Sequence, residues 1–177
     1  LVYCSTFLKL KSGKFLAKPG VPRVITYEGK KIDYIEHGEG PAILFIPGSF
    51  STPSAWSAVQ KLMPPNYRFI STSLCGYGST EELRSTDNYG MQNLIDIIET
   101  VVAKIGQSVH LVGHSFGGMV ALACALSDRF EILSITTFEA NPITLIDACR
   151  HRHLFEETIK IKDEFEAAFN AQNKDAA

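Results

Sequence analysis

The sequence lacks several features that would indicate particular classes of protein. Its 177 residues contain no basic cluster larger than Lys30-Lys31 and carry a formal net charge of −2, which argues against nucleic acid as a partner. No uninterrupted apolar run approaches the length of a membrane span, so we expect no membrane partner. What remains is an ordinary soluble globular protein, with enough residues for one domain and a substantial buried core.

Cysteines are also few, and they are widely spaced. They lie at positions 4, 75, 124 and 149, with no C-x-x-C pair and no spacing typical of metal ligands. We therefore expect reduced thiols, a cytoplasmic location, no metal and no cofactor. Cys124 lies in an apolar segment, where we expect it to be a small core residue.

The first residues do not form a convincing targeting signal. Lys9 and Lys11 interrupt the apolar residues of positions 1–18, and no small-residue cleavage site follows them. We interpret residues 1–20 as an N-terminal arm. Because the chain begins with Leu1 rather than methionine, we expect it to be processed or to be a piece of a longer protein.

The most informative stretch is residues 109–118, Val-His-Leu-Val-Gly-His-Ser-Phe-Gly-Gly. Its first five residues are typical of a buried strand, and the helix-forming run 119–126 follows it. Between them lies Gly-x-Ser-x-Gly, centred on Ser115, and a strand, a sharp turn and a helix are the context of a nucleophile elbow. The two glycines allow the strand and the helix to approach closely, because neither has a Cβ. The following helix supplies free N–H groups where an oxyanion would develop. We predict that Ser115 is a covalent nucleophile rather than part of a simple small-residue turn.

Elsewhere, strand patterns alternate with helix patterns after an opening hairpin at Glu28-Gly29-Lys30. The predicted strands are 21–27, 31–36, 42–46, 67–74, 109–113 and 132–138, and the predicted helices are 54–62, 91–105, 119–126 and 154–169. This order predicts an α/β fold, with a mostly parallel sheet and helices on both faces. We divide the chain into the arm, a core of residues 21–142, and a helical segment of residues 143–177.

Three local patterns make the chain resemble the α/β-hydrolase superfamily over roughly residues 21–142. They are the elbow Gly113-His114-Ser115-Phe116-Gly117-Gly118, the loop Ile46-Pro47-Gly48-Ser49-Phe50 with Trp56 downstream, and the turn Ser73-Leu74-Cys75-Gly76-Tyr77-Gly78-Ser79. The resemblance implies that the loop and the elbow supply an oxyanion hole, with the backbone amides of Ser49 and Phe116 as donors. It also implies that residues 143–177 begin a cap-like segment.

The chain departs from that family at two positions. Pro47 stands where the oxyanion loop usually has histidine, but the expected donors are other residues, so the hole can still form. Ser73 stands where the later turn usually has aspartate, and we expect its hydroxyl to cap the turn less firmly than a carboxylate.

The resemblance implies a triad in the chain order serine, acid, histidine. Glu139, at the end of the strand after the elbow strand, is one candidate acid, and a residue one strand later is the alternative. A glutamate that only bonds a loop or lines the rim of a cavity would occupy the same place.

The catalytic histidine is harder to assign. His37 and His110 precede strands, so we expect them at the wrong edge of the sheet. His114 diverges from Ser115 in the elbow, so we expect it to have a packing role. We expect His151 and His153 to be solvated surface residues. The family's histidine follows two further strands that we do not see, so we predict that the chain stops before it and that the sheet is incomplete at its C-terminal side.

Three functions remain open at this point. The first is a serine hydrolase that acts on an ester or related bond of a small molecule, present as an incomplete chain without its general base. The second is a non-catalytic module of the same fold that binds a ligand or a partner. The third is other transfer chemistry on this fold, such as acyl transfer or C–C bond hydrolysis, because fold alone does not decide the reaction. In each case the strand 132–138 would be an exposed edge that invites self-association.

Overall fold

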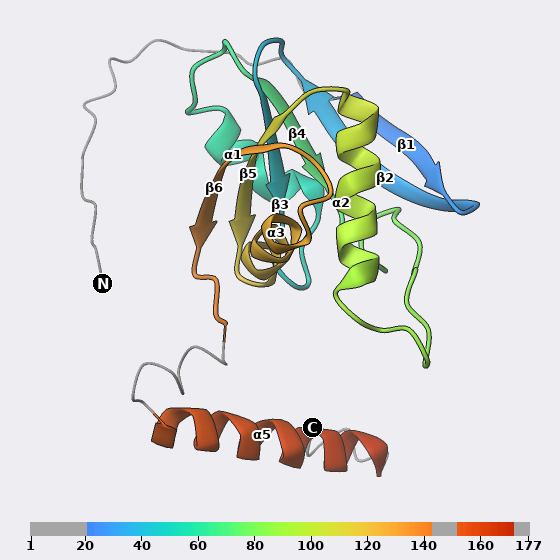
Figure 1. The fold of residues 1–177 in the computed structure, drawn as a ribbon, viewed down its shortest axis with the longest axis vertical. Helices are drawn as coiled ribbons and strands as arrows, with labels where there is room; N and C mark the ends of the chain where they lie inside the picture. The colour runs from blue at the N-terminus through green and yellow to red at the C-terminus, as the bar shows by residue number, and fades with distance from the viewer. Residues whose placement is uncertain (1–20, 143–151, 172–177) are drawn as a thin grey trace. The chain divides into compact units, whose positions relative to one another are not determined.

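The computed structural model describes residues 21–142 and 152–171, so the predicted arm, residues 1–20, lies outside the described residues. The chain divides into two compact units, and the boundary between them in the sequence lies between Glu139 and Ala140. The first unit contains a six-stranded sheet (Figure 1). Its strands are β1 (Val21–Tyr27), β2 (Lys30–His37), β3 (Ala42–Ile46), β4 (Arg68–Thr72), β5 (Val109–His114) and β6 (Ile132–Phe138). The helices of this unit are η1 (Pro53–Trp56), α1 (Ser57–Gln60), α2 (Gln92–Ile105) and α3 (Phe116–Ser127).

The strands are arranged in the order β1-β2-β4-β3-β5-β6. The pairs β1–β2 and β2–β4 are antiparallel, whereas β4–β3, β3–β5 and β5–β6 are parallel. The predicted hairpin is confirmed, since Tyr27 pairs with Lys30 across the two-residue turn Glu28-Gly29. Both turn residues have positive φ, as a type I′ turn requires.

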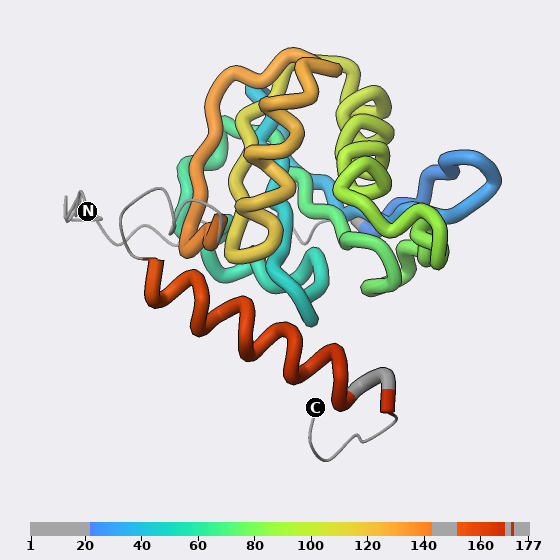
Figure 2. The backbone as a smooth tube through the Cα atoms, turned by 60° about the horizontal axis from the view of Figure 1, so that its bottom comes forward, coloured from blue at the N-terminus to red at the C-terminus, as the bar shows by residue number. Residues whose placement is uncertain are grey.

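Helices cover both faces of the sheet, as predicted. The side chains of β3 alternate between two apolar clusters, and all five are buried. Leu44 belongs to the large cluster that contains the apolar faces of α2 and α3, which lie side by side on one face of the sheet (Figure 2). Phe45 points to the other face and packs against Trp56 of η1, with ring centroids 5.1 Å apart. A strand that is apolar on both faces is typical of the centre of a parallel sheet.

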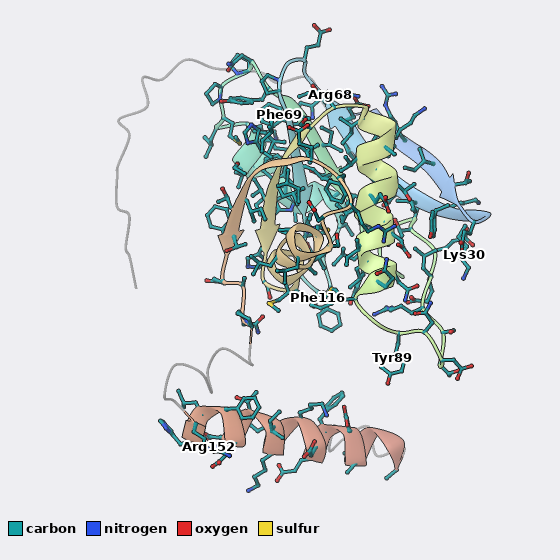
Figure 3. All side chains as sticks on the ribbon, viewed as in Figure 1. Lys30, Arg68, Phe69, Tyr89, Phe116 and Arg152 are labelled. Atoms are coloured by element: carbon teal, nitrogen blue, oxygen red, sulfur yellow. The ribbon has the colours of Figure 1, made fainter. Side chains whose placement is uncertain are left out.

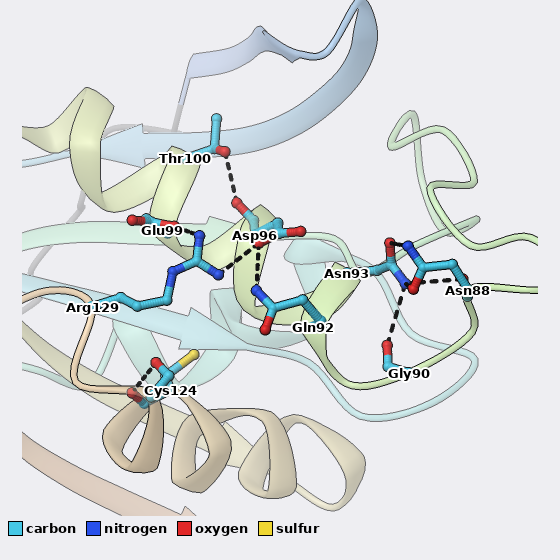
Figure 4. Close-up of polar contacts among 10 residues, drawn as sticks. Asn88, Gly90, Gln92, Asn93, Asp96, Glu99, Thr100, Cys124 and Arg129 are labelled. Atoms are coloured by element: carbon cyan, nitrogen blue, oxygen red, sulfur yellow. Dashed lines mark hydrogen bonds and ion pairs between the residues drawn. The ribbon is translucent and has the colours of Figure 1, made fainter.

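An ionic contact ties the covering helix α2 to the segment before β6. The guanidinium of Arg129 donates to Asp96 at 2.7 Å and also contacts Glu99, and both acids lie on α2 (Figure 4). Cys124 lies nearby on α3 and is fully buried, so the prediction that it is a core residue is confirmed. Cys75 and Cys124 are both free thiols.

Two predicted boundaries differ from the structure. The segment 54–62 begins as a 3-10 turn at Pro53 and continues as the short helix α1, and β4 is shorter than the predicted 67–74.

In the described residues, no helix is both long and apolar enough to cross a membrane.

The second unit contains α5 (Arg152–Asn170), at the place of the predicted amphipathic helix 154–169. Ion pairs one turn apart run along it, among them Lys162 with Glu166 at 3.0 Å. The rest of the predicted cap-like segment, residues 143–151 with His151 and residues 172–177, lies outside the described residues.

Candidate active site

Ser115 occupies a strained turn between the end of β5 and the start of α3. Its φ is 50° and its ψ is −119°, a backbone conformation that residues with a Cβ rarely adopt. The turn is held by hydrogen bonds, since the Ser115 N–H donates to the Phe138 carbonyl at 2.8 Å and the Ser115 carbonyl accepts from Gly118 N–H at 2.9 Å. This is the strand, turn and helix arrangement that the sequence predicts.

The two glycines of the elbow are required by close approach of the backbone. A Cβ added at Gly113 would lie 2.4 Å from the carbonyl oxygen of Gly117. One added at Gly117 would lie 2.4 Å from the carbonyl oxygens of both Ile46 and Pro47. The second contact also places the start of α3 directly against the end of β3, where the predicted oxyanion loop begins.

The predicted oxyanion loop lies against the elbow. Gly48 is so close that an added Cβ would be 3.3 Å from the Ser115 Cβ and 3.0 Å from Nδ1 of His114. Ser49 follows Gly48 and is exposed, while Phe116 is the first residue of α3 and half-buried. Figure 3 shows Phe116 at the carboxyl ends of the parallel strands, opposite Phe69 and Arg68 at the other end. The structure therefore brings Ser49 and Phe116 to the same end of the sheet as Ser115.

Strained backbone gathers at this end of the sheet. Among the described residues five non-glycine residues have positive φ, and three of them are Phe50, Ser115 and Glu139. The other two, Glu28 and Asp128, have ordinary roles in the hairpin turn and at the end of α3. Such outliers are retained at functional sites when the surrounding structure enforces them.

A small cavity of about 130 Å³ opens beside the elbow. Its walls combine apolar groups with one imidazole, and the lining residues are Pro47, Gly48, Ser51, Ala55, Trp56, Val59 and His114. The indole Nε1 of Trp56 is buried and has no hydrogen-bond partner among the described residues.

The prediction that His114 has only a packing role is wrong. Its side chain is 48% exposed, and its Nε2 lies 3.3 Å from Oε2 of Glu139. The two residues meet because His114 pairs with Phe138 at the carboxyl ends of the parallel strands β5 and β6, and Glu139 follows directly. The candidate acid therefore contacts the histidine that precedes Ser115.

His37 and His110 lie at the opposite end of the sheet, as predicted. His37 pairs with Phe69 near the start of β4, and His110 pairs with Ile43 near the start of β3. Burial lowers the pKa of His37, whose Nδ1 has no partner in the described part of the chain. His153 is an exposed residue of α5, in the second unit.

The expectation that Ser73 caps the later turn is also wrong. The Ser73 hydroxyl is buried and has no hydrogen-bond partner among the described residues. Asp33, from β2, instead accepts the Ser79 N–H at 2.9 Å. The sequence contained no signal for this contact, because the two residues are 46 positions apart and only the sheet order brings them together.

Comparison with known proteins agrees with this geometry. A family described as "Alpha/beta hydrolase family" matches residues 43–171, more than half of the chain. A pimeloyl-[acyl-carrier protein] methyl ester esterase of Aeromonas salmonicida is 29% identical over 105 residues, which is 59% of this chain and 40% of that protein. A fluoroacetate dehalogenase of a Burkholderia species is 27% identical over 124 residues, covering 68% of this chain and 41% of that protein.

Solved structures show the same relationship. An epoxide hydrolase from Vigna radiata superposes with a TM-score of 0.61 at 28% identity and covers 67% of this chain and 39% of that one. A thioesterase domain from the curacin biosynthetic pathway superposes with a TM-score of 0.62 at 27% identity, over 68% of this chain and 46% of that one. The chain spans less than half the length of these relatives. These relatives are hydrolases by name, and the chain belongs to the α/β-hydrolase family.

Proposed function

We propose that the protein to which this chain belongs is a serine hydrolase that cleaves an ester or related bond of a small molecule. The observation that carries the proposal is the strained Ser115, seated between β5 and α3 with the Gly48-Ser49 loop against it. A methyl ester esterase and a thioesterase domain among the similar proteins support an acyl substrate.

In the proposed reaction, Ser115 Oγ attacks the carbonyl carbon and gives its proton to a general base. The amides of Ser49 and Phe116 stabilise the resulting oxyanion, and each such donor contributes about 3–4 kcal/mol of barrier reduction in enzymes where it has been removed. The bond to the alcohol breaks, and the alcohol leaves with the proton. Water then hydrolyses the acyl-enzyme and releases the acid and the free serine.

We propose Glu139 as the acid that orients the base, with a residue of a later strand as the alternative. The base itself lies outside the residues that the structure describes in this unit. Of the three histidines in residues 21–142, only His114 lies at the Ser115 end of the sheet, and in the described residues its ring bonds Glu139 and makes no hydrogen bond to the Ser115 hydroxyl.

A second candidate function is a non-catalytic module that binds a small ligand at the same end of the sheet, and it is favoured by the lack of an assigned base among the described residues. A fluorophosphonate label separates the two. We expect covalent labelling that Ser115→Ala abolishes and that Ser85→Ala, a change in an exposed loop, leaves intact. Folded protein that takes up no label, with or without any downstream polypeptide, would favour the binding module. Hydrolysis of short p-nitrophenyl esters by the same two preparations shows where the base resides.

We also propose a cytoplasmic location, supported by two free buried thiols, and self-association through β6. Within the described residues β6 pairs with β5 alone, and Leu133 and Phe138 are each 50% exposed. Sedimentation at several concentrations tests this: a single monomeric species at every concentration would refute the self-association.

A further inference from the structure

The turn that follows β4 is held by a carboxylate from a different strand. Both oxygens of Asp33 are used: Oδ2 accepts the Ser79 N–H at 2.9 Å, and Oδ1 accepts the Thr80 hydroxyl at 3.0 Å. The Thr80 hydroxyl in turn accepts the Asp33 N–H at 3.0 Å. Three hydrogen bonds, two of them to a charged acceptor, therefore fasten this turn to β2.

The side chain of Ser73 lies close to the same part of the turn as the Asp33 carboxylate. A Cβ added at Gly78 would lie 2.7 Å from Asp33 Oδ2 and 2.4 Å from Ser73 Oγ, so both side chains converge on it. The antiparallel pairing of Tyr34 with Thr72 explains this, because it brings the preceding and following residues of the two strands together. The serine hydroxyl makes no hydrogen bond in the described structure, so of these two side chains only the carboxylate of Asp33 bonds the turn, beside the turn's own backbone hydrogen bonds.

This turn reaches the oxyanion loop through an aromatic pair. The rings of Tyr77 and Phe50 meet edge to face, with centroids 6.2 Å apart and an interplanar angle of 86°. The backbone of Phe50 is strained, with a φ of 58°. Its side chain is 91% exposed, so few groups other than Tyr77 contact the ring. Its backbone continues directly from Ser49, the proposed oxyanion donor.

We infer that Asp33 is a positioning residue, which holds the Gly76–Thr80 turn and, through Tyr77 and Phe50, orients the amide of Ser49. This inference rests on the proposed function, because it assigns a role to that amide. It makes two separable claims: that the carboxylate position can be exchanged between residues 33 and 73, and that the turn controls the oxyanion loop.

The first claim is tested by unfolding equilibria of four variants. We expect Asp33→Ser to raise the unfolding equilibrium constant about tenfold or more, as loss of hydrogen bonds to a charged group does. Ser73→Asp should destabilise the wild type, because the new carboxylate would lie beside that of Asp33 and the two like charges repel. The same change should stabilise the Asp33→Ser variant, because it restores a carboxylate next to the turn. Asp87→Asn, a change of an exposed aspartate, serves as the control. A Ser73→Asp effect of the same sign in both backgrounds would overturn the exchange.

The second claim is tested by fluorophosphonate labelling of Ser115. We expect Asp33→Asn and Tyr77→Leu each to lower the maximal inactivation rate about tenfold, with the half-saturating concentration unchanged. A displaced oxyanion donor reduces the stabilisation of the transition state but does not change how tightly the label binds before it reacts. Asp87→Asn should leave both values unchanged. An unchanged maximal inactivation rate in Tyr77→Leu would overturn the link through the aromatic pair.

Amide hydrogen exchange separates this inference from the proposed function. If the wild type takes up no label, the hydrolase proposal fails, and the positioning claim is decided by exchange at Ser79 and Ser49. We expect Asp33→Asn to speed exchange at both amides relative to Asp87→Asn. Faster exchange at Ser79 alone would show that the turn does not act on the loop. Where Asp33→Asn does not fold, Tyr77→Leu gives the same readout at Ser49.

Discussion

The imidazole of His114 and the carboxylate of Glu139 form a contact at the carboxyl end of the sheet, with Nε2 3.3 Å from Oε2. Two adjacent parallel strands present these residues, and Ser115 follows His114 directly. The pair is open to solvent, since the Glu139 side chain is 84% exposed. Its contribution to stability is therefore small, and its functional importance depends on Glu139, which we propose as the acid that orients the base.

Replacing Glu139 separates these two contributions. We expect Glu139→Gln to change the free energy of unfolding by less than about 0.5 kcal/mol, as exposed ion pairs do. The rate of Ser115 labelling should fall at least about tenfold if the carboxylate orients the base, because an amide does not hold the same tautomer. Glu39→Gln, an exposed glutamate at the other end of the sheet, is the matched control. Unchanged labelling would place the acid on a later strand.

Gly117 should tolerate no side chain. A Cβ there would meet the carbonyl oxygens of Ile46 and Pro47 at 2.4 Å, and these are backbone atoms that cannot move aside as a flexible side chain would. We expect Gly117→Ala to cost at least about 3 kcal/mol or to prevent folding, because the start of α3 would have to leave the end of β3.

Gly90→Ala is the control for this steric argument. Gly90 has no neighbouring atom within 4 Å of an added Cβ, so we expect a change within about 0.5 kcal/mol. Urea unfolding followed by the fluorescence of Trp56, the single tryptophan, measures both variants. Equal stability of the two variants would contradict the close packing of the elbow.

His37 should make stability depend on pH. Burial lowers its pKa below the ordinary 6.5, so the folded state resists protonation more than the unfolded state does. The unfolded chain then binds more protons below about pH 6.5, and stability falls as the pH drops through that value. His37 stacks at 5.2 Å on Phe69, a contact that an apolar ring would keep.

The variant His37→Phe removes this titration. We expect its free energy of unfolding to decrease less than that of the wild type between pH 7.5 and pH 5.5, as measured by urea unfolding at each pH. His153→Phe, a change at an exposed histidine of α5, is the control. A wild-type loss of stability that persists in full in His37→Phe would assign it to other groups.

Cys124 should be inert in the folded protein. It is fully buried, and burial raises the pKa of its thiol to about 12, so almost no reactive thiolate forms near neutral pH. We expect no alkylation of Cys124 by iodoacetamide at pH 8 under native conditions and rapid alkylation in denaturant, as followed by peptide mass spectrometry. Native modification at the rate of a free thiol would show that α3 opens readily.

Local sequence patterns were sufficient for most of the elements and for the elbow that carries Ser115. The five apolar residues of β3 indicated a strand buried on both faces, and Glu28-Gly29 indicated a tight hairpin, because each depends on residues that are adjacent in the chain. The same is true of the elbow around Ser115, since its glycines, its strand and its helix lie within one short segment. Helix and strand ends were less well predicted, as at Pro53, where a 3-10 turn replaces the start of the helix.

Only the tertiary structure revealed which distant side chains meet. Asp33 holds a turn 46 residues away, and Glu139 contacts His114 rather than an unassigned base. These contacts follow from the order and register of the strands, which hydrophobic periodicity does not encode, because a period identifies the buried face of a strand but not its neighbour. The polar partners of the site were therefore decided by the packing of the sheet, while the elbow that carries Ser115 was already evident in ten consecutive residues.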